Sequence, residues 1–202
     1  MDKMIKNVIL LRHGKTVGNL EKRYIGSRTD ISLSEEGVRE IELAAPEIRE
    51  MAGESFYLVS SPMKRAHETA GLIFPQNKIH TNPKLREIDF GDFEGKNYEE
   101  LKENPEYIRW IESSGTLPFP NGERRDEFIE RSLEGFMESL AGSDKAEKLI
   151  IVCHGGNIMG IMSSITGKDY FDFMTGNMGG YSLTLTMENE RIVDISYISI
   201  NP

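Results

Sequence analysis

The chain has 202 residues, of which 38% are hydrophobic and 28% are charged, and its formal net charge at pH 7 is −9. An acidic chain of this length predicts one ordinary domain and argues against nucleic-acid binding, because a phosphate backbone is neutralised by clustered Lys and Arg. No apolar run is long enough for a membrane-spanning helix or a signal peptide, and Cys153 is the only cysteine. These features predict a cytoplasmic protein without membrane association or a cysteine-held metal.

Short apolar runs are the first structural signal along the chain. Residues 8–11, 56–59 and 149–153 are continuously apolar, as expected of buried strands in a parallel sheet. Near the end, residues 181–187 and 191–199 alternate between apolar and polar, which predicts a hairpin that turns around Glu188 and Asn189.

Helical signals lie between these strands. A helix is predicted after Ser34, with Pro46 kinking or dividing it. Ser61 and Pro62 predict a second helix through about Phe74, with the proline in its first position. Asn104-Pro105 repeats this signal and predicts two short helices within residues 97–113. Apolar residues at helical spacing predict another helix near 123–141.

Alternating strands and helices predict an α/β fold with a mainly parallel central sheet and helices on both of its faces. We expect residues 1–202 to form a single domain. The Gly- and Pro-rich stretch 85–122 breaks the alternation and is interpreted as a small cap of helices and loops over one end of the sheet. The C-terminal hairpin offers an edge through which a homodimer can form.

Basic and imidazole side chains follow each of the three apolar strands. Arg12-His13-Gly14 follows the first, residues 60–65 with Arg65 follow the second, and His154-Gly155-Gly156 follows the third. Ligands of open parallel sheets bind beyond the carboxyl ends of the strands, so these residues are expected to meet there. A local basic cluster in an acidic protein predicts a small phosphate or carboxylate ligand.

The same residue types match one reaction class. Histidine can attack phosphorus, and arginine pairs with non-bridging phosphate oxygens. A carboxylic acid must then protonate the leaving oxygen and later activate water. The acidic loop 87–94 offers Glu87, with Asp89, Asp92 and Glu94 as neighbouring alternatives.

Taken in order, these motifs resemble those of the histidine phosphatase superfamily, also called phosphoglycerate-mutase-like, over nearly the whole chain. The resemblance rests on Arg12-His13-Gly14, on Asn19 with Arg23 and Gly26 in an N-x-x-x-R-x-x-G pattern, on the stretch 60–70, on the acid loop 85–95 and on the run 152–156. The family's fold agrees with the α/β architecture predicted above.

The resemblance also implies residue roles. His13 is the nucleophile that becomes phosphorylated, and Glu87 is the proton donor and later the base. The phosphoryl group is bound by Arg12, Arg65, His154 and Asn19. Further candidates for substrate binding are Lys15, Arg23 and Gly26, where Lys15 replaces the Glu or Gln of many members. Neither a metal ion nor another cofactor is expected, because the arginines supply the positive charge, and the expected partner is a small phosphorylated metabolite.

The region after the acid loop resembles the small bacterial phosphatases. Its pattern, which includes Trp110 and the run Pro118-Phe119-Pro120-Asn121-Gly122-Glu123, is closest to α-ribazole phosphatase and to broad-specificity members. Arg124 and Arg125 follow that run and favour a more anionic substrate. The resemblance therefore implies a metal-independent phosphomonoester hydrolase, with α-ribazole 5′-phosphate as a candidate substrate. The alternatives are a cofactor-dependent phosphoglycerate mutase and a catalytically weak regulatory module that binds phosphate esters.

Overall fold

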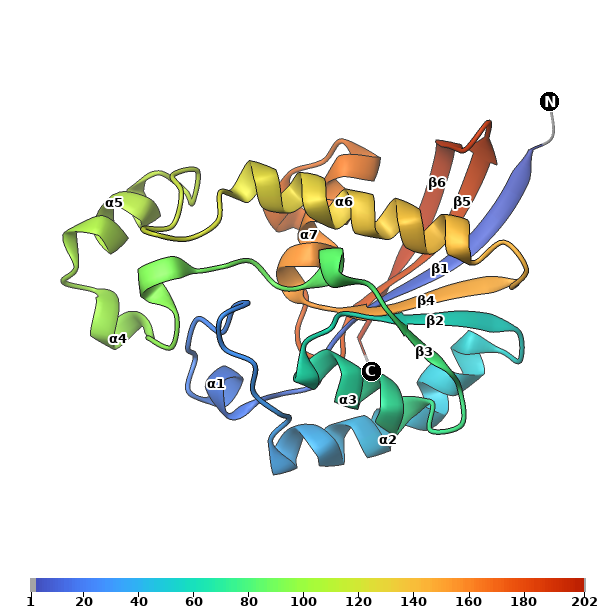
Figure 1. Ribbon diagram of the computed structural model, residues 1–202, viewed down its shortest axis with the longest axis horizontal. Coiled ribbons are helices and arrows are strands. Elements are labelled where there is room, and N and C mark those ends of the chain that lie inside the picture. The colour runs from blue at the N-terminus through green and yellow to red at the C-terminus, as the bar shows by residue number, and fades with distance from the viewer. Residues whose placement is uncertain (1–2, 202) are drawn as a thin grey trace.

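Figure 1 shows a computed structural model in which one sheet lies between two layers of helices; the structure describes residues 3–201. The strands are β1 (Met4–Arg12), β2 (Phe56–Ser60), β3 (Ile79–Thr81), β4 (Lys148–Cys153), β5 (Gly180–Glu188) and β6 (Arg191–Ile200), in the spatial order β3-β2-β4-β1-β5-β6. Strands β1 to β4 are parallel, whereas β5 and β6 form an antiparallel hairpin. The mainly parallel sheet and the terminal hairpin are thus confirmed.

Helices cover both faces of this sheet, as predicted (Figure 1). They are α1 (Val17–Leu20), α2 (Glu35–Ala52), α3 (Lys64–Ile73), α4 (Tyr98–Leu101), α5 (Pro105–Glu112), α6 (Arg125–Gly142) and α7 (Gly155–Thr166), with 3-10 turns η1 (Pro83–Leu85), η2 (Gly91–Phe93) and η3 (Tyr170–Phe173). Helices α2 and α3 pack on one face, and α6 and α7 pack on the other.

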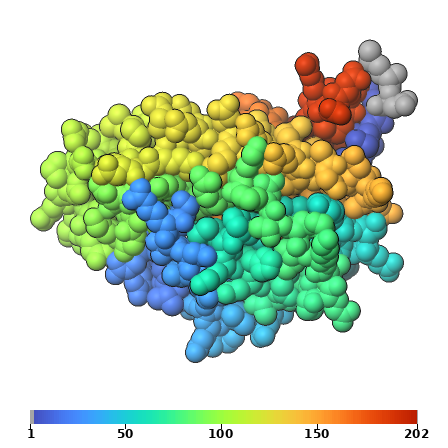
Figure 2. Space-filling view, viewed as in Figure 1, coloured from blue at the N-terminus to red at the C-terminus, as the bar shows by residue number. Residues whose placement is uncertain are grey.

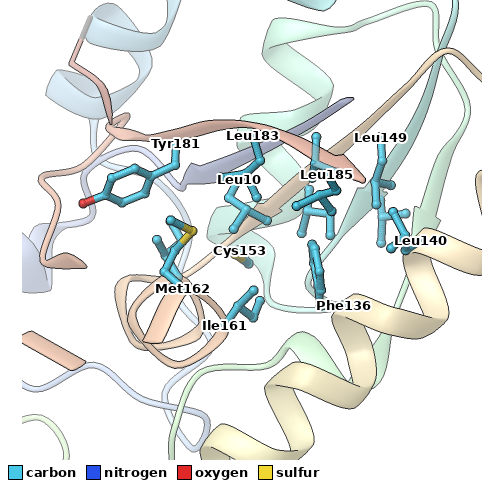
Figure 3. Packing of buried hydrophobic residues seen from close by; sticks show 14 of the residues in the cluster. Leu10, Phe136, Leu140, Leu149, Cys153, Ile161, Met162, Tyr181, Leu183 and Leu185 are labelled. Atoms are coloured by element: carbon cyan, nitrogen blue, oxygen red, sulfur yellow. The ribbon is translucent and has the colours of Figure 1, made fainter. Parts of the chain in front are cut away.

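The central strand β1 explains why its sequence is continuously apolar. Successive side chains of a strand point to opposite faces. Leu10 packs with Phe136 of α6 and Ile161 of α7 in one buried cluster (Figure 3), whereas Leu11 packs with Ile41 of α2 in the other. Both faces of β1 are therefore buried, and an alternating polar pattern would place polar groups in one of the two cores.

The register of the parallel strands brings three chain segments to one edge of the sheet. Arg12 at the end of β1 pairs with Cys153 at the end of β4, and Ser60 at the end of β2 pairs with Val152. The residues that follow these strands therefore emerge side by side, and α7 begins directly after β4.

Residues 91–119, which belong to the stretch 85–122 predicted as a cap, build a smaller unit beyond that edge of the sheet. This unit is called the cap below. Helices α4 and α5 lie at the end of the molecule farthest from the terminal hairpin (Figure 1), and the surface there is green to yellow in Figure 2. This unit has its own apolar cluster, which includes Phe93, Tyr107 and Phe119 and packs on Phe128 in the first turns of α6. Aromatic packing thus fixes the unit to the rest of the fold.

Two local predictions need correction. Helix α2 continues through Pro46 instead of dividing there. Pro46 and Glu42 are both exposed, so water can solvate the backbone carbonyl that lacks a helical donor. Helix α3 begins at Lys64, with Met63 as its N-cap, and not at Pro62. Ser61 instead accepts a hydrogen bond from Met63 N at 3.3 Å and contacts His154, which keeps residues 61–63 out of the helix.

The other predicted helices are confirmed, and three further elements were not predicted from the sequence. The two short helices within 97–113 and the helix near 123–141 are confirmed as α4, α5 and α6. Strand β3 and helices α1 and α7 were not predicted. No helix within residues 3–201 is long and apolar enough to cross a membrane. Strand β6 is an edge strand of the sheet, and its use in a homodimer stays a prediction.

We expect Pro46→Ala to stabilise the protein. Alanine restores the backbone donor and removes the ring from the helix interior, so the free energy of unfolding should rise by roughly 1–3 kcal/mol. Equilibrium urea unfolding measures this change. Glu47→Ala, at the next exposed position, is the control and should change the stability by less than about 0.5 kcal/mol. An unchanged or lower stability of Pro46→Ala would contradict the interpretation.

Candidate active site

His13 lies directly after β1 and is almost completely buried, with 3% of its surface exposed. Its Nδ1–H donates to the carbonyl oxygen of Gly14 at 2.7 Å, and its Nε2 accepts a hydrogen bond from Arg65 Nε at 3.2 Å. These two contacts select the tautomer that carries its lone pair on Nε2. Burial, followed by the charges of Arg65 and Arg12, lowers the pKa of His13 well below its usual value. The imidazole is therefore neutral and nucleophilic at pH 7.

Arg65 reaches His13 from the first turn of α3. The side chain is buried, and its two terminal nitrogens donate to the carbonyl oxygens of Thr29, Ile25 and Gly26 at 3.1 to 3.4 Å. These backbone contacts fix the guanidinium plane. Within residues 3–201 no carboxylate forms a salt bridge with Arg65, so its charge stays available to an anion.

His154 is the N-cap residue of α7 and lies 5.1 Å from His13, measured between ring centroids. Its Nε2 contacts Ser61 Oγ at 2.8 Å. Ser61 Oγ accepts from Met63 N and can at the same time donate its hydroxyl hydrogen to His154 Nε2. The proton of the neutral ring then lies on Nδ1, which turns that nitrogen into a hydrogen-bond donor.

Three buried polar atoms in this region have no hydrogen-bond partner among the described residues: Arg12 Nε, His154 Nδ1 and Thr175 Oγ1. Arg12 is nevertheless fixed in place, because its Nη1 donates to the carbonyl oxygen of Thr175 at 2.7 Å. Unpaired buried polar groups are costly and rare, so their concentration here indicates a ligand-binding site. Two of the three are nitrogen donors beside two arginines, and the ligand that satisfies them is an anion.

Glu87 provides a carboxyl group at the same site. It is buried, with 8% of its surface exposed, and its Oε1 accepts a hydrogen bond from Ile88 N at 3.0 Å. The absence of a side chain at Gly156 makes room for it, since a Cβ there would lie 2.4 Å from Oε1. Burial raises the pKa of Glu87, although its backbone hydrogen bonds and the two arginines oppose that shift. A raised pKa favours the protonated acid, the form that can donate a proton.

The loop that carries Glu87 is held from both sides. Arg131 of α6 donates to the carbonyl oxygens of Lys84 and Arg86, and it forms a two-pronged ion pair with Glu123 at 2.8 and 2.9 Å. Glu123 in turn accepts from Asp89 N at 3.3 Å. Residues before and after Glu87 are thereby tied to one ion pair. Of the acidic side chains in this loop, Glu87 is the buried one.

Asn19, from α1, faces this region through a network around its amide. Its Oδ1 accepts from the backbone and hydroxyl of Thr16 at 3.0 Å each, and from Asn177 Nδ2 at 3.3 Å. With its oxygen occupied, the amide NH₂ group of Asn19 is the end left for a ligand. Asn177 also donates to the His13 carbonyl oxygen at 2.9 Å, which ties the network to the backbone of His13.

Three further sequence candidates have different surroundings. Lys15 is bound by Glu36 and Glu40 of α2 at 2.8 and 2.5 Å, which raises the pKa of Lys15 to about 12. Arg23 is likewise paired, with Glu21 and Glu100. Gly26 acts through its backbone.

These contacts argue against two of the candidate roles. The ammonium group of Lys15 and the guanidinium of Arg23 are neutralised by carboxylates, so we do not place them in the anion site. Gly26 instead positions Arg65 through its carbonyl oxygen. A side chain at Gly26 would collide with the Ile88 carbonyl oxygen at 2.3 Å, next to Glu87.

A cavity of about 220 Å³ opens beside Glu87 and Gly156. Its walls are mainly aromatic and come from the cap, α6 and η3. The rings are those of Tyr24, Phe90, Trp110, Phe119, Tyr170 and Phe171. Arg125 is the cation of this lining. The cavity is smaller than the roughly 300–1,000 Å³ of typical ligand pockets, so it fits a small group attached to the bound anion.

Sequence reasoning missed several residues of this arrangement. Ser61 follows the β2 strand, but no pattern shows that it contacts His154. Thr175, Asn177 and Tyr170 come from the segment after α7, which carries no motif in the sequence. In the described part of the chain, no three His, Cys, Asp or Glu side chains are arranged to hold a metal ion.

Comparisons with known proteins agree with this geometry. The model of the histidine phosphatase superfamily (branch 1) matches residues 8–196. The metal-independent phosphoserine phosphatase of Arabidopsis thaliana is 31% identical over 172 residues, which cover 80% of this chain and 69% of the relative.

Two solved structures illustrate the structural similarity. The phosphoserine phosphatase of Entamoeba histolytica, in complex with 3-phosphoglyceric acid, has a TM-score of 0.74 at 25% identity, covering 88% of this chain and 90% of the other. The alpha-ribazole phosphatase of Shigella flexneri has a TM-score of 0.81 at 21% identity, and the match covers 97% of this chain and 96% of the other. At that identity, the second similarity concerns the fold alone.

We expect Ser61→Ala to weaken the binding of inorganic phosphate. The change removes the partner of His154 Nε2, so the proton is no longer directed to Nδ1. The dissociation constant should rise roughly fivefold, corresponding to one hydrogen bond of about 1 kcal/mol, as measured by isothermal titration calorimetry. Ser60→Ala is the matched control, because within residues 3–201 Ser60 Oγ forms one hydrogen bond, to the Ser61 carbonyl oxygen. Equal weakening in both variants would show that the loop backbone, and not the His154 contact, is responsible.

Proposed function

The chain belongs to branch 1 of the histidine phosphatase superfamily, and on this basis we propose that it hydrolyses small phosphate monoesters through a phosphohistidine at His13. The observation that carries this proposal is the group of unpaired buried atoms beside a neutral histidine and a buried carboxyl group. A phosphoryl group supplies the acceptor oxygens that Arg12 and His154 lack, and it brings phosphorus to His13 Nε2. The name of the Arabidopsis relative supports the same chemistry.

In the first step, His13 Nε2 attacks phosphorus. The Nε2–P bond forms while the ester P–O bond breaks, and the proton of the Glu87 carboxyl group passes to the leaving oxygen. In the second step, the Glu87 carboxylate takes a proton from water, whose oxygen attacks phosphorus and releases His13. The step ends with inorganic phosphate and with Glu87 protonated again.

The positive groups act on the charge of the transferred phosphoryl group. Arg65 exchanges its 3.2 Å contact with His13 Nε2 for a phosphoryl oxygen, which leaves the lone pair free to attack. Arg12 Nε and His154 Nδ1 bind further oxygens. Fixed donors in a buried site stabilise the transition state without reorganisation. This is why the mechanism needs no metal ion.

The aromatic cavity beside Glu87 receives the leaving alcohol in this proposal. Glu87 lines the cavity, so the oxygen that it protonates lies beside the cavity. A flat or apolar group suits the aromatic walls. The benzimidazole of α-ribazole 5′-phosphate is one such group, and that ester remains a candidate substrate.

Phosphate release tests the proposed function. In EDTA, we expect release from a panel containing nitrophenyl phosphate, phosphoserine, α-ribazole 5′-phosphate and 3-phosphoglycerate. His13→Ala should lower the rate by at least a thousandfold, and acid-labile, base-stable phosphate on the protein should disappear with it. Isomerisation of phosphoglycerate without net release would indicate the mutase alternative. Binding without turnover would indicate a regulatory module.

Glu87→Gln tests the acid role. We expect at least a hundredfold loss of kcat for esters of alkyl alcohols, which need a proton, and a much smaller loss for nitrophenyl phosphate. In the native protein, kcat/KM for the alkyl esters should fall as the pH rises through the raised pKa of Glu87, because the proton donor is lost. The variant should lose this alkaline decline. Equal losses for both ester types would assign the proton transfer to another group.

We further propose that the protein acts in the cytoplasm on a small phosphorylated metabolite. The free, buried Cys153 supports the cytoplasmic location. The cavity of about 220 Å³ supports a small ligand. Cell fractionation with antibody detection tests the location.

A further inference from the structure

The cavity beside Glu87 contains two hydrogen-bond donors that lack strong acceptors. Trp110 Nε1 is shielded from solvent and has no partner among residues 3–201. Arg125, in the first turn of α6, donates only to the Ser114 carbonyl oxygen at 3.4 Å, and no carboxylate in the described part of the chain forms a salt bridge with it. Both residues belong to the lining of the cavity.

The two donors gather around Gly115. A Cβ at this position would lie 3.2 Å from the Trp110 indole, 3.6 Å from the carbon that bears Nε1, and 3.8 Å from Arg125 Nη1. Gly115 has a φ of +68°, which disfavours any residue with a side chain. Glycine at this position therefore leaves the space beside the indole and the guanidinium free of a further side chain.

The other polar groups of the cavity are already engaged. The Tyr24 hydroxyl contacts the Tyr107 hydroxyl at 3.0 Å, and the Tyr170 hydroxyl donates to the Gly156 carbonyl oxygen at 3.4 Å. Glu87 is the acidic side chain of the lining and is assigned to the leaving oxygen. Apart from Glu87, the lining of the cavity therefore offers hydrogen-bond donors and positive charge to a ligand. Within residues 3–201, it contains no second carboxylate that would compete for them.

Arg124 and Arg125 are neighbours in the sequence but have different partners. Arg124 is exposed and paired with Asp126 at 2.8 Å and Glu127 at 3.8 Å. Arg125 is held instead by aromatic rings, 5.5 Å from the Tyr170 centroid and 5.9 Å from the Phe171 centroid. Stacking on rings fixes a guanidinium while leaving its N–H edge free for a planar, bidentate acceptor.

We propose that Trp110 and Arg125 form a carboxylate subsite, so that the preferred substrate is a phosphate monoester whose leaving alcohol ends in a carboxylate. This inference rests on the proposed hydrolase function. Guanidinium and indole N–H groups match the two oxygens of a carboxylate, and the aromatic walls contact the small body between the carboxylate and the ester oxygen. The cavity volume of about 220 Å³ limits that body to a compact group.

A matched pair of esters tests the subsite. The first is 4-(carboxymethyl)phenyl phosphate, and the second is its amide, 4-(carbamoylmethyl)phenyl phosphate. They share the ring and the ester bond, and the methylene group keeps their leaving-group acidities similar. We expect the native protein to favour the carboxylate by at least about tenfold in kcat/KM, because hydrogen bonds to charged groups are the strong ones.

Three variants locate the preference. Arg125→Gln should lower the carboxylate-to-amide ratio about tenfold, and Arg125→Lys should retain part of it. Trp110→Phe keeps a ring but removes the N–H, and should lower the ratio about fivefold. Arg124→Gln is the matched control from the same turn and should leave the ratio unchanged. Thermal unfolding of each variant verifies that the fold is intact.

The outcomes separate the subsite from the function on which it rests. A carboxylate-to-amide ratio that falls in Arg125→Gln and stays at the native value in Arg124→Gln supports the subsite. Hydrolysis of both esters without a preference, or an equal loss on both in the variant, overturns it and leaves the hydrolase proposal standing. If nitrophenyl phosphate and both esters are not hydrolysed by the native protein, the proposed function itself fails.

Discussion

The desolvation of two arginines, Arg65 buried and Arg12 partly buried, that form no salt bridge within residues 3–201 is the constraint on which the rest of the site depends. Arg12 and Arg65 are desolvated at the carboxyl edge of the sheet, and in the part of the chain described here neither forms a salt bridge. A buried, uncompensated cation is expensive, and the cost falls when an anion binds. Burial of His13, together with these charges, lowers the pKa of His13 and keeps the imidazole neutral and nucleophilic. One electrostatic arrangement thus provides both anion binding and a reactive imidazole.

Backbone carbonyl oxygens make this arrangement tolerable. The Arg65 guanidinium donates to three of them, and Arg12 donates to that of Thr175. Carbonyl groups orient a guanidinium without cancelling its full charge, whereas a carboxylate would neutralise it. Lys15 and Arg23 illustrate the opposite case, since each is held by two glutamates. The distinction between a functional and a structural cation here lies in the partner, not in the residue type.

In the proposed function, the cap contributes the part of the site that contacts the leaving group. Its aromatic cluster packs on the first turns of α6, and this packing brings Trp110 and Phe119 to the cavity beside Glu87. The ion pair between Glu123 and Arg131 connects the chain that follows the cap to the loop that carries Glu87, because Glu123 also accepts a hydrogen bond from Asp89 N. A change in the cap can therefore alter the leaving group that is accepted while Arg12, His13 and His154 stay in place.

The sequence by itself determined the α/β class, the buried strands and the meeting of Arg12, His13, Arg65 and His154. These follow from local patterns, because a continuously apolar strand must be covered on both faces and the ends of parallel strands share an edge. The choice of Glu87 over Asp89, Asp92 and Glu94 as the proton donor rested on the family resemblance and not on a local pattern.

Only the tertiary structure decided which polar groups are paired. Whether Lys15 faces an anion or two glutamates, whether Ser61 caps a helix or orients His154, and whether Arg125 lacks a carboxylate all depend on residues distant in sequence. Local periodicity carries no information about such contacts. They arise when the packing of α2, α6 and the segment after α7 brings side chains within hydrogen-bond distance.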